Sequence, residues 1–194
     1  AYLETLRHES ERLSHLVENV LSYARLERGR AARRIETTTA AGLVDAMEPR
    51  LRQRAEQAGM RLRLELPPEV AGASIRTDLT AVEQIVFNLV DNAAKYARRP
   101  DRAGTITLSV ARGNAADRLA LRVADDGPGL SPGVRRRLFQ PFSKSAAEAA
   151  DSQPGVGLGL ALCRRLARQE LRGDLVLEKS DASGTTFRLD MRSQ

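Results

Sequence analysis

TAVEQIVFNLVDNAAKY, residues 80–96, is the stretch on which the interpretation of the whole chain depends. Apolar residues recur in it at steps of three and four, as in a helix that buries one face, and these are Val82, Ile85, Val86, Leu89, Val90 and Ala93. Asn88, Asn92 and Lys95 recur at the same steps and form a polar column beside that face. Amide oxygens can ligate Mg²⁺ and a lysine can contact phosphate, so the column suits a metal–nucleotide complex. A partly solvated helix face is the alternative.

The composition is that of a soluble globular protein. The chain has 194 residues, of which 42% are hydrophobic and 29% charged, enough for one core with an appendage or for two small domains. No apolar run approaches the ~20 residues that span a bilayer, and the start lacks a signal-peptide pattern. The single cysteine, Cys163, lies in an apolar run, which excludes disulfides and cysteine metal sites and fits a cytoplasmic location. Any anchor in the inner membrane would belong to other parts of a parent protein.

The positive charge does not predict a nucleic-acid partner. The net charge is +6, but the arginines are spread along the sequence, and the chain contains no tryptophan to interleave with them. A nucleic-acid surface would be expected to gather its basic residues on one face or stripe. We therefore expect no nucleic-acid binding.

Residues 1–29 predict a long amphipathic helix. Leu6, Leu13, Val17, Val20 and Ala24 form a heptad seam that needs another helix to cover it. Because this helix begins at residue 1 without a cap, we interpret it as half of a helical hairpin that forms a bundle on dimerisation. The Arg-rich residues 30–39 are a predicted linker, and residues 40–194 are a second domain.

The second domain is expected to be α+β. The first predicted helix runs from Thr39 or Ala40 to Gly59, with a kink or late start at Pro49. The helix at residues 80–96 is expected to be capped by Asp78 or Thr80, with a capping box of Thr80 and Glu83. A last helix is expected at residues 156–171, and strands at 60–66, 74–77, 105–111, 118–124, 175–178 and 185–191. Helices and strands do not alternate strictly, which favours a mixed, largely antiparallel sheet with helices on one face, a two-layer sandwich.

Two further motifs suit a nucleotide. Asp125 ends a predicted strand and precedes Gly127 and Gly129, so a carboxylate that can accept from an exocyclic amine stands beside backbone that a ligand can approach. An ordinary Asp-Gly-Pro-Gly turn is the alternative. Gly155, Gly157 and Gly159 precede the last helix, whose free N–H groups would favour phosphate, although glycine caps without ligands are also common. Residues 143–154 before them have little to bury and are expected to form a lid.

Taken together and in this order, the motifs resemble the four boxes of sensor histidine kinases, in the GHKL class of ATP-binding domains. They read Asn-x-x-x-Asn-x-x-Lys-Tyr (88–96), Asp-x-Gly-x-Gly (125–129), Phe-x-Pro-Phe (139–142) and Gly-x-Gly-x-Gly-Leu (155–160). The resemblance covers residues 35–191 and implies a Bergerat-type fold, a mixed sheet backed by helices, preceded by the N-terminal helix. That helix resembles the second helix of the dimerisation and phosphotransfer hairpin.

The resemblance also implies roles for individual residues around the cofactors ATP and Mg²⁺. Asn92 would be the main magnesium ligand, Asn88 a second amide near the metal or the phosphates, and Lys95 a phosphate contact. Tyr96 would pack near the adenosine, and Asp125 would accept from the adenine amino group, supported by Thr185 through water. The remaining assignments are to glycines and to the lid: Gly127 and Gly129 at the adenine wall, Gly155, Gly157 and Gly159 with Leu160 around the triphosphate, and Lys144 toward the γ-phosphate.

A kinase fits the sequence better than a hydrolase. Related ATPases such as gyrase place a glutamate where Asn88 stands, and an amide cannot act as a general base at neutral pH. His8 and His15 lack the sequence that follows a phosphoacceptor histidine in the family, so we expect the acceptor upstream of residue 1 and a fragment unable to autophosphorylate alone. The expected partners are ATP, the missing phosphoacceptor helix, a second copy in a homodimer and the receiver domain of a response regulator. A non-catalytic scaffold, an ATPase and a serine kinase of the same superfamily remain alternatives.

Two departures from the family pattern were also evident. Residues 169–173, QELRG, replace the usual short turn with paired glycines, which leaves the end of the last helix open. The predicted lid has few cations beyond Lys144 to contact phosphate.

Overall fold

The computed structural model describes residues 34–99, 103–113, 115, 117–141 and 157–192. The predicted N-terminal helix, with His8 and His15, lies outside the described residues, as do the whole of the predicted lid with Lys144 and the first glycine of the last box, Gly155.

Most helices and strands of the described chain lie close to those predicted, and two short helices and the first strand were not predicted. The helices are α2 (Ala40–Gln57), α3 (Pro68–Ala71), α4 (Leu79–Tyr96), α5 (Pro132–Arg137) and α7 (Gly159–Gln169). The strands are β1 (Ile35–Thr39), β2 (Arg61–Glu65), β3 (Ser74–Asp78), β4 (Thr105–Arg112), β5 (Arg118–Asp125), β6 (Asp174–Asp181) and β7 (Gly184–Arg192).

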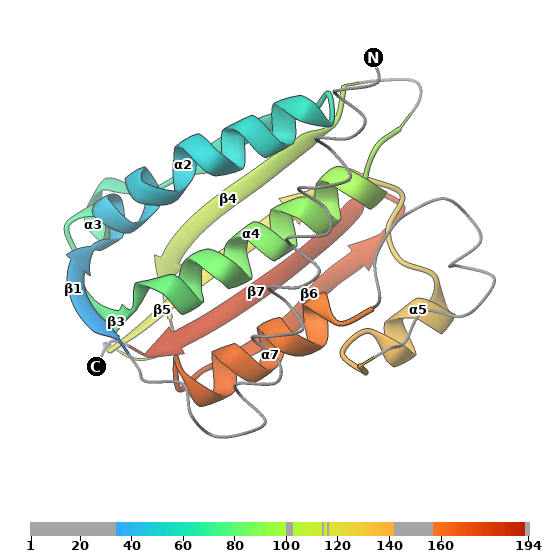
Figure 1. Ribbon diagram of the computed structural model, residues 1–194. Helices are drawn as coiled ribbons and strands as arrows, with labels where there is room; N and C mark the ends of the chain where they lie inside the picture. Colours follow the sequence, from blue (N-terminus) through green and yellow to red (C-terminus); the bar gives the residue numbers. More distant parts are fainter. Residues whose placement is uncertain (1–33, 100–102, 114, 116, 142–156, 193–194) are drawn as a thin grey trace, which may run out of the picture.

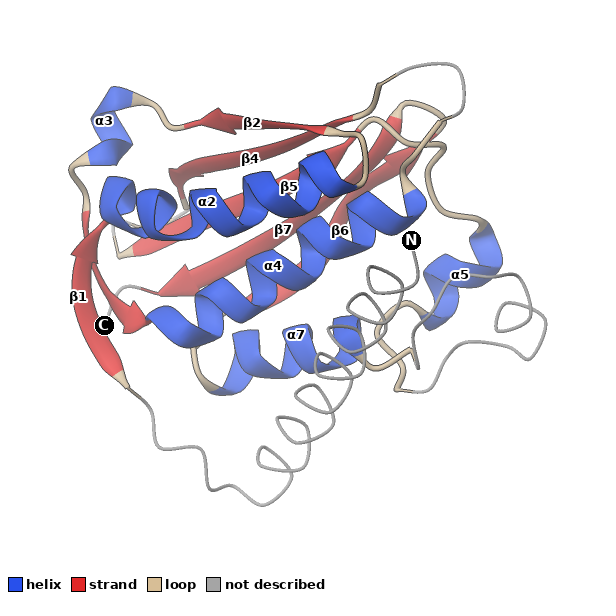
Figure 2. Cartoon of the chain, turned by 45° about the horizontal axis from the view of Figure 1, so that its top comes forward, coloured by secondary structure: helices blue, strands red, loops and turns tan. Residues whose placement is uncertain are grey.

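A five-stranded mixed sheet backed by helices forms the body of the domain. Its strand order is β2-β4-β5-β7-β6, and β2 pairs with β4 in parallel while the other three pairs are antiparallel. Helices α2, α4 and α7 cover one face of this sheet side by side (Figures 1 and 2). The predicted α+β class, with a mixed and largely antiparallel sheet and helices on one face, is confirmed.

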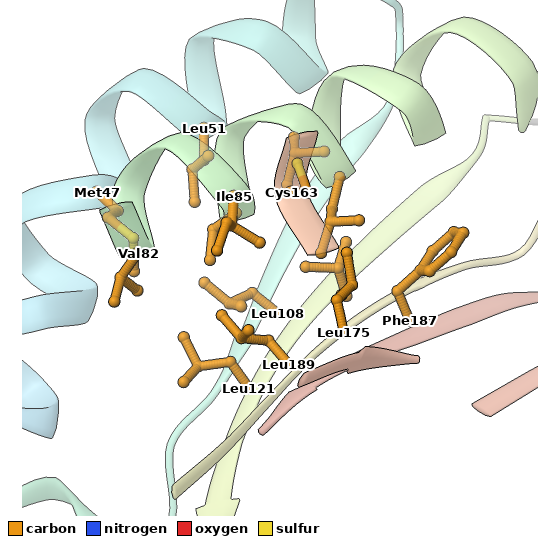
Figure 3. Close-up of a cluster of buried hydrophobic side chains, with 14 of the residues drawn as sticks. Met47, Leu51, Val82, Ile85, Leu108, Leu121, Cys163, Leu175, Phe187 and Leu189 are labelled. Carbon is orange, nitrogen blue, oxygen red and sulfur yellow. The ribbon is translucent and has the colours of Figure 1, made fainter. Parts of the chain in front are cut away.

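The core lies between the helices and the inner face of the sheet because apolar residues alternate along the strands. In β4, buried and half-buried residues alternate from Thr105 to Val110, which places every second side chain against the helices. The largest side chains that are almost fully buried come from both layers, and they include Leu51, Ile85, Leu162, Leu108, Leu121, Leu175 and Leu189. Figure 3 shows this packing, with Cys163 buried in it. Burial raises the pKa of the Cys163 thiol to about 12, so it acts as an apolar core residue.

A second, two-stranded sheet joins the start of the described chain to α4. Strand β1 pairs antiparallel with β3, so Ile35–Thr39, which the sequence analysis places in a linker, is part of the folded domain. At its end the side chain of Asp78 accepts from the backbone N–H of Arg34 at 3.2 Å and from that of Ala81 at 3.0 Å. One buried carboxylate therefore holds the incoming chain and caps the first turn of α4.

Several predicted helix ends differ from those observed. The N-cap of α4 is Asp78, so Thr80 lies inside the helix and the predicted capping box with Glu83 is wrong. Helix α2 starts at Ala40, capped by Thr39, and continues through Pro49, so a late start is also wrong. The last helix begins at Gly159 rather than at residue 156. After its end at Gln169, Arg172 adopts a φ of 50°, the left-handed conformation that the family's glycines would take without strain.

Among the residues that the structure describes, no helix combines the length and apolar character needed to cross a membrane.

Candidate functional site

The candidate site is built on the C-terminal half of α4. Asn88 lies there with its Nδ2 donating to the carbonyl of Gln84 at 2.9 Å, the residue one turn before it. This bond fixes the amide so that Oδ1 points away from its own helix and toward the start of α7. A Cβ built on Gly159 would lie 3.3 Å from that oxygen. The free oxygen has the chemistry that Mg²⁺ accepts, so the amide fits the predicted role.

The rest of the polar column is arranged around Asp91. Lys95 Nζ lies 2.5 Å from Asp91 Oδ2, and Arg54 of α2 lies 2.7 Å from Asp91 Oδ1. A phosphate that binds Lys95 must therefore compete with Asp91 or share the ammonium with it. Within the described part of the chain, Asn92 is half-buried and its side chain makes no hydrogen bond, which leaves its amide available for a ligand.

Asp125 stands at the end of β5, opposite Thr185 in the register with β7. Its Oδ1 accepts from the N–H of Gly127 at 2.9 Å and from the N–H of Thr185 at 3.3 Å. Burial raises the pKa of Asp125 above its ordinary value, and the two N–H donors oppose that rise by stabilising the charge. Thr185 thus contacts the carboxylate directly through its backbone, while its Oγ1 lies 3.4 Å from Ser180 Oγ. With Oδ1 occupied, Oδ2 is the atom available to a base.

The glycines around Asp125 allow backbone segments to meet. A Cβ on Gly127 would lie 2.6 Å from Ala97 Cα, at the end of α4. A Cβ on Gly129, whose φ is +78°, would lie 2.2 Å from the carbonyl oxygen of Asp181. Both glycines are therefore required by close approach within the protein, and Gly129 by its backbone conformation as well.

The start of α7 is where the sequence predicts phosphate contacts. Gly157 has a φ of 72°, and Leu158, the N-cap residue of α7, makes no side-chain capping hydrogen bond within the described part of the chain. The backbone N–H groups of a first helical turn, with the helix dipole, favour an anion. Leu160 is half-buried and packs against the hydrophobic core, so its contribution to the site is to hold the helix in place.

These segments converge on α4. The start of α7 reaches it at Asn88, and the loop after β5 reaches its end at Ala97. Tyr96 ends the helix and is 44% exposed. Phe139, the first residue of the Phe-x-Pro-Phe motif, packs against the core, with the guanidinium of Arg164 4.6 Å from its ring centre. The predicted residues Lys144, Gly155 and Phe142 lie outside the described residues.

Sequence reasoning missed two charged residues beside the site. Asp91 stands four residues before Lys95, and this spacing on a helix would have indicated the pair. Arg99 Nη2 donates to the carbonyl of Gly127 at 2.8 Å and to that of Ala182 at 2.5 Å. No local pattern indicates this contact, because both acceptors are distant in sequence.

Comparison with known proteins confirms the resemblance to sensor histidine kinases. Residues 77–194 match the family model described as histidine kinase-, DNA gyrase B- and HSP90-like ATPase. The chain is 33% identical over 185 residues to the histidine protein kinase DivJ of Caulobacter vibrioides, covering 95% of this chain and 30% of that protein. It is 29% identical over 197 residues to the non-motile and phage-resistance protein of the same species, covering 98% of this chain and 22% of that protein.

A solved structure extends the likeness to the whole chain. Full-length ShkA in complex with AMPPNP is similar with a TM-score of 0.77 and 27% identity, over 100% of this chain and 39% of that one. The chain spans less than a third of the length of each of the two curated relatives named above. The chain belongs to the histidine kinase-, DNA gyrase B- and HSP90-like ATPase family, as a catalytic domain of the sensor histidine kinase type.

Proposed function

We propose that this chain binds Mg-ATP and presents the γ-phosphate to a histidine of a phosphoacceptor helix, as part of a two-component signalling kinase. The observation that carries the proposal is the convergence on α4 of two separate segments, the start of α7 at Asn88 and the Asp125 loop at Ala97. The first would present the backbone N–H groups of a helix start to an anion, and the second would present a carboxylate to a base. In the full protein the phosphate would pass to an aspartate of a response-regulator receiver domain, and the protein would act as a homodimer.

The base would be held by Asp125 and the phosphates by α4 and α7. Asp125 Oδ2 accepts from the adenine amino group, while Gly127 and Thr185 keep Oδ1 occupied and the carboxylate in one orientation. Lys95 and the first N–H groups of α7 bind phosphate oxygens. Asn88 and Asn92 hold Mg²⁺, which when bound neutralises charge on the phosphates. Of the two residues predicted to complete the phosphate contacts, Gly155 would wrap the triphosphate and Lys144 would reach the γ-phosphate.

Transfer is favoured over hydrolysis by the chemistry of Asn88. Its Nδ2 is already bound to the carbonyl of Gln84, and neither atom of a neutral amide can take a proton from water. Positioning and charge neutralisation would then provide most of the catalysis, with the nucleophile supplied by an imidazole.

Nucleotide binding can be tested by thermal stabilisation. A non-hydrolysable ATP analogue at about 100 times its Kd should stabilise the folded protein by about 2.7 kcal/mol, which for a chain of this size is about 5–10 °C in Tm. The shift should require Mg²⁺ and should be lost in Asn92→Ala. No shift at millimolar nucleotide would instead indicate a non-catalytic scaffold.

Phosphotransfer needs an acceptor supplied in trans. A separately purified phosphoacceptor hairpin from a related kinase, mixed with this chain and ATP, should gain phosphate that is labile to acid. The same reaction with His8→Gln and His15→Gln in this chain should proceed unchanged, because the added hairpin provides the acceptor. Acid-stable phosphoserine, or release of inorganic phosphate without transfer, would contradict the proposal in favour of a serine kinase or an ATPase.

A further inference from the structure

Arg99 ties together two segments that form the wall beside Asp125. It lies in the loop just after α4, and one of its nitrogens, Nη2, donates both to the carbonyl of Gly127 at 2.8 Å and to that of Ala182 at 2.5 Å. Those two acceptors belong to the loop after β5 and to the turn between β6 and β7. Its Nε is buried without a partner in the part of the chain that the structure describes. A buried donor without a partner lowers the stability of the fold, so we expect the two bonds that Arg99 does make to matter for the site.

Both bonded segments lead to the Asp125 carboxylate. Gly127, whose carbonyl Arg99 holds, donates its own N–H to Asp125 Oδ1 at 2.9 Å. The turn that contains Ala182 leads into Thr185, whose N–H donates to the same oxygen at 3.3 Å. Each of the two donors that orient Asp125 is thus fixed, within three residues, by a bond to one nitrogen of Arg99.

The segments around these bonds approach one another closely. A Cβ on Gly127 would lie 2.6 Å from Ala97 Cα, and a Cβ on Gly184 would lie 1.8 Å from the carbonyl oxygen of Asp125. The three segments therefore meet backbone to backbone, without side chains between them. A movement of either loop by a few tenths of an ångström would lengthen one of the hydrogen bonds to Oδ1. The bond from the Thr185 N–H, at 3.3 Å, is already near the limit for a hydrogen bond.

We infer that Arg99 is a positioning residue that sets the preference of the site for adenine, by fixing the two backbone donors that orient Asp125. This inference rests on the proposed function, since it assumes that Asp125 accepts from the adenine amino group. Arg99 itself does not touch the base in this scheme. The guanidinium suits the role because two N–H groups of one planar nitrogen reach two carbonyls in fixed directions, which a lysine ammonium reproduces only in part.

The experiment compares the binding of ATP with that of inosine triphosphate, which carries a carbonyl where adenine carries the amino group. Dissociation constants for both, with Mg²⁺, are measured by calorimetry on the wild-type chain and on Arg99→Met, Arg99→Lys and Arg192→Met. Inosine triphosphate cannot donate the hydrogen bond that the adenine amino group would give to the Asp125 carboxylate, so wild type should bind ATP about 10- to 100-fold more tightly. Arg99→Met should reduce that preference by about three-fold or more, mainly through weaker ATP binding, and Arg99→Lys should lie between.

Arg192→Met is the matched control. Arg192 ends β7, at the opposite end of that strand from Thr185, and pairs with the exposed Asp117, so its replacement should leave the preference for ATP unchanged. Both constants come from one preparation, so a partly unfolded variant lowers the number of sites without changing the ratio. A wild-type preference that survives in Arg99→Met would overturn the role of Arg99 and leave the proposed function standing. Equal binding of the two nucleotides by wild type would overturn the base contact itself, and the inference with it.

Discussion

Replacement of Gly184 by alanine should be among the most damaging single-methyl changes in this domain. Gly184 begins β7 with a φ of +137°, a region that residues with a side chain rarely adopt. A Cβ there would lie 1.8 Å from the carbonyl oxygen and 2.8 Å from the carbonyl carbon of Asp125. The added methyl therefore meets two separate penalties, one in the backbone of residue 184 and one in its contact with β5.

Alanine variants of three other glycines measure the backbone strain and the steric contact separately. Gly72 has an ordinary φ of −82° and open space around its Cβ position, so Gly72→Ala should be neutral or stabilise by up to about 1 kcal/mol. Gly59 has a φ of +69° with nothing near it, so its alanine variant should lose only about 1–2 kcal/mol of backbone strain. Gly173 has no left-handed φ but a Cβ position 1.7 Å from the carbonyl oxygen of Asp190, so it tests the contact alone.

The contact term is the larger. Relief of an approach below 2 Å requires backbone atoms to move by more than 1 Å, and overpacking of this kind costs about 1–3 kcal/mol or more. The sum for Gly184→Ala is then about 2–6 kcal/mol, against about 5–15 kcal/mol for the stability of a typical domain. In a chain of this size that corresponds to a fall in Tm of about 4–24 °C.

Urea unfolding of the four variants and wild type, followed by circular dichroism, measures the free energies directly. The expected order of destabilisation is Gly184, Gly173, Gly59 and then Gly72. Because the clash at Gly184 displaces Asp125, that variant should also lose ATP affinity, whereas Gly173→Ala should keep it in the folded fraction. The reasoning would be refuted by a Gly184→Ala variant no less stable than Gly59→Ala, or by a Gly72→Ala variant as unstable as Gly173→Ala.

Three further predictions concern stability. Arg172→Gly should raise the free energy of unfolding by about 0.5–1 kcal/mol, because Arg172 holds a φ of 50°; an unchanged or lower urea midpoint would contradict this. Leu162→Ala should lower it by about 2–5 kcal/mol, since Leu162 is 0% exposed between α7 and the sheet, and a loss below 1 kcal/mol would show that the core can collapse onto the space. Burial alone would raise the pKa of Asp174, but hydrogen bonds from Arg164, Arg168 and the Leu175 N–H lower it to about 2. The stability it provides is present above pH 3.8 and is lost as the pH falls toward 2, so Asp174→Asn should show a smaller loss across that window in acid unfolding curves, and equal losses would refute the assignment.

The long helices and strands could be predicted from the sequence because the spacing of their apolar residues fits either a helix or a strand, but not both. The apolar residues of α4 recur as in a helix, and those of β4 and β5 alternate as in strands, and these elements appear within two residues of the expected ends. Strand β1, with the sequence IETTT, was missed because one apolar residue cannot set a period and its pairing with β3 is set across the fold.

For the candidate site, too, local motifs could be predicted from the sequence, whereas contacts between distant segments could not. The residues expected to touch the nucleotide belong to local motifs whose chemistry can be recognised without a structure, although their roles remain predictions. The cap of α4 was left between Asp78 and Thr80 because both can cap a helix, and only the end of β3 decides between them. Arg99 was missed because its acceptors are 28 and 83 residues away, and no short pattern encodes such a contact.

The double role of Asp78 has a mechanical consequence. The chain joins the domain at the first turn of α4, where one carboxylate grips both Arg34 and Ala81, while Asn92 and Tyr96 sit at the opposite end of an 18-residue helix. Such a helix is about 27 Å long, so this anchor and the candidate site lie at its two ends. A variant that loses the Asp78 carboxylate should therefore release the incoming chain and uncap the helix together, at a distance from the residues expected to hold the nucleotide.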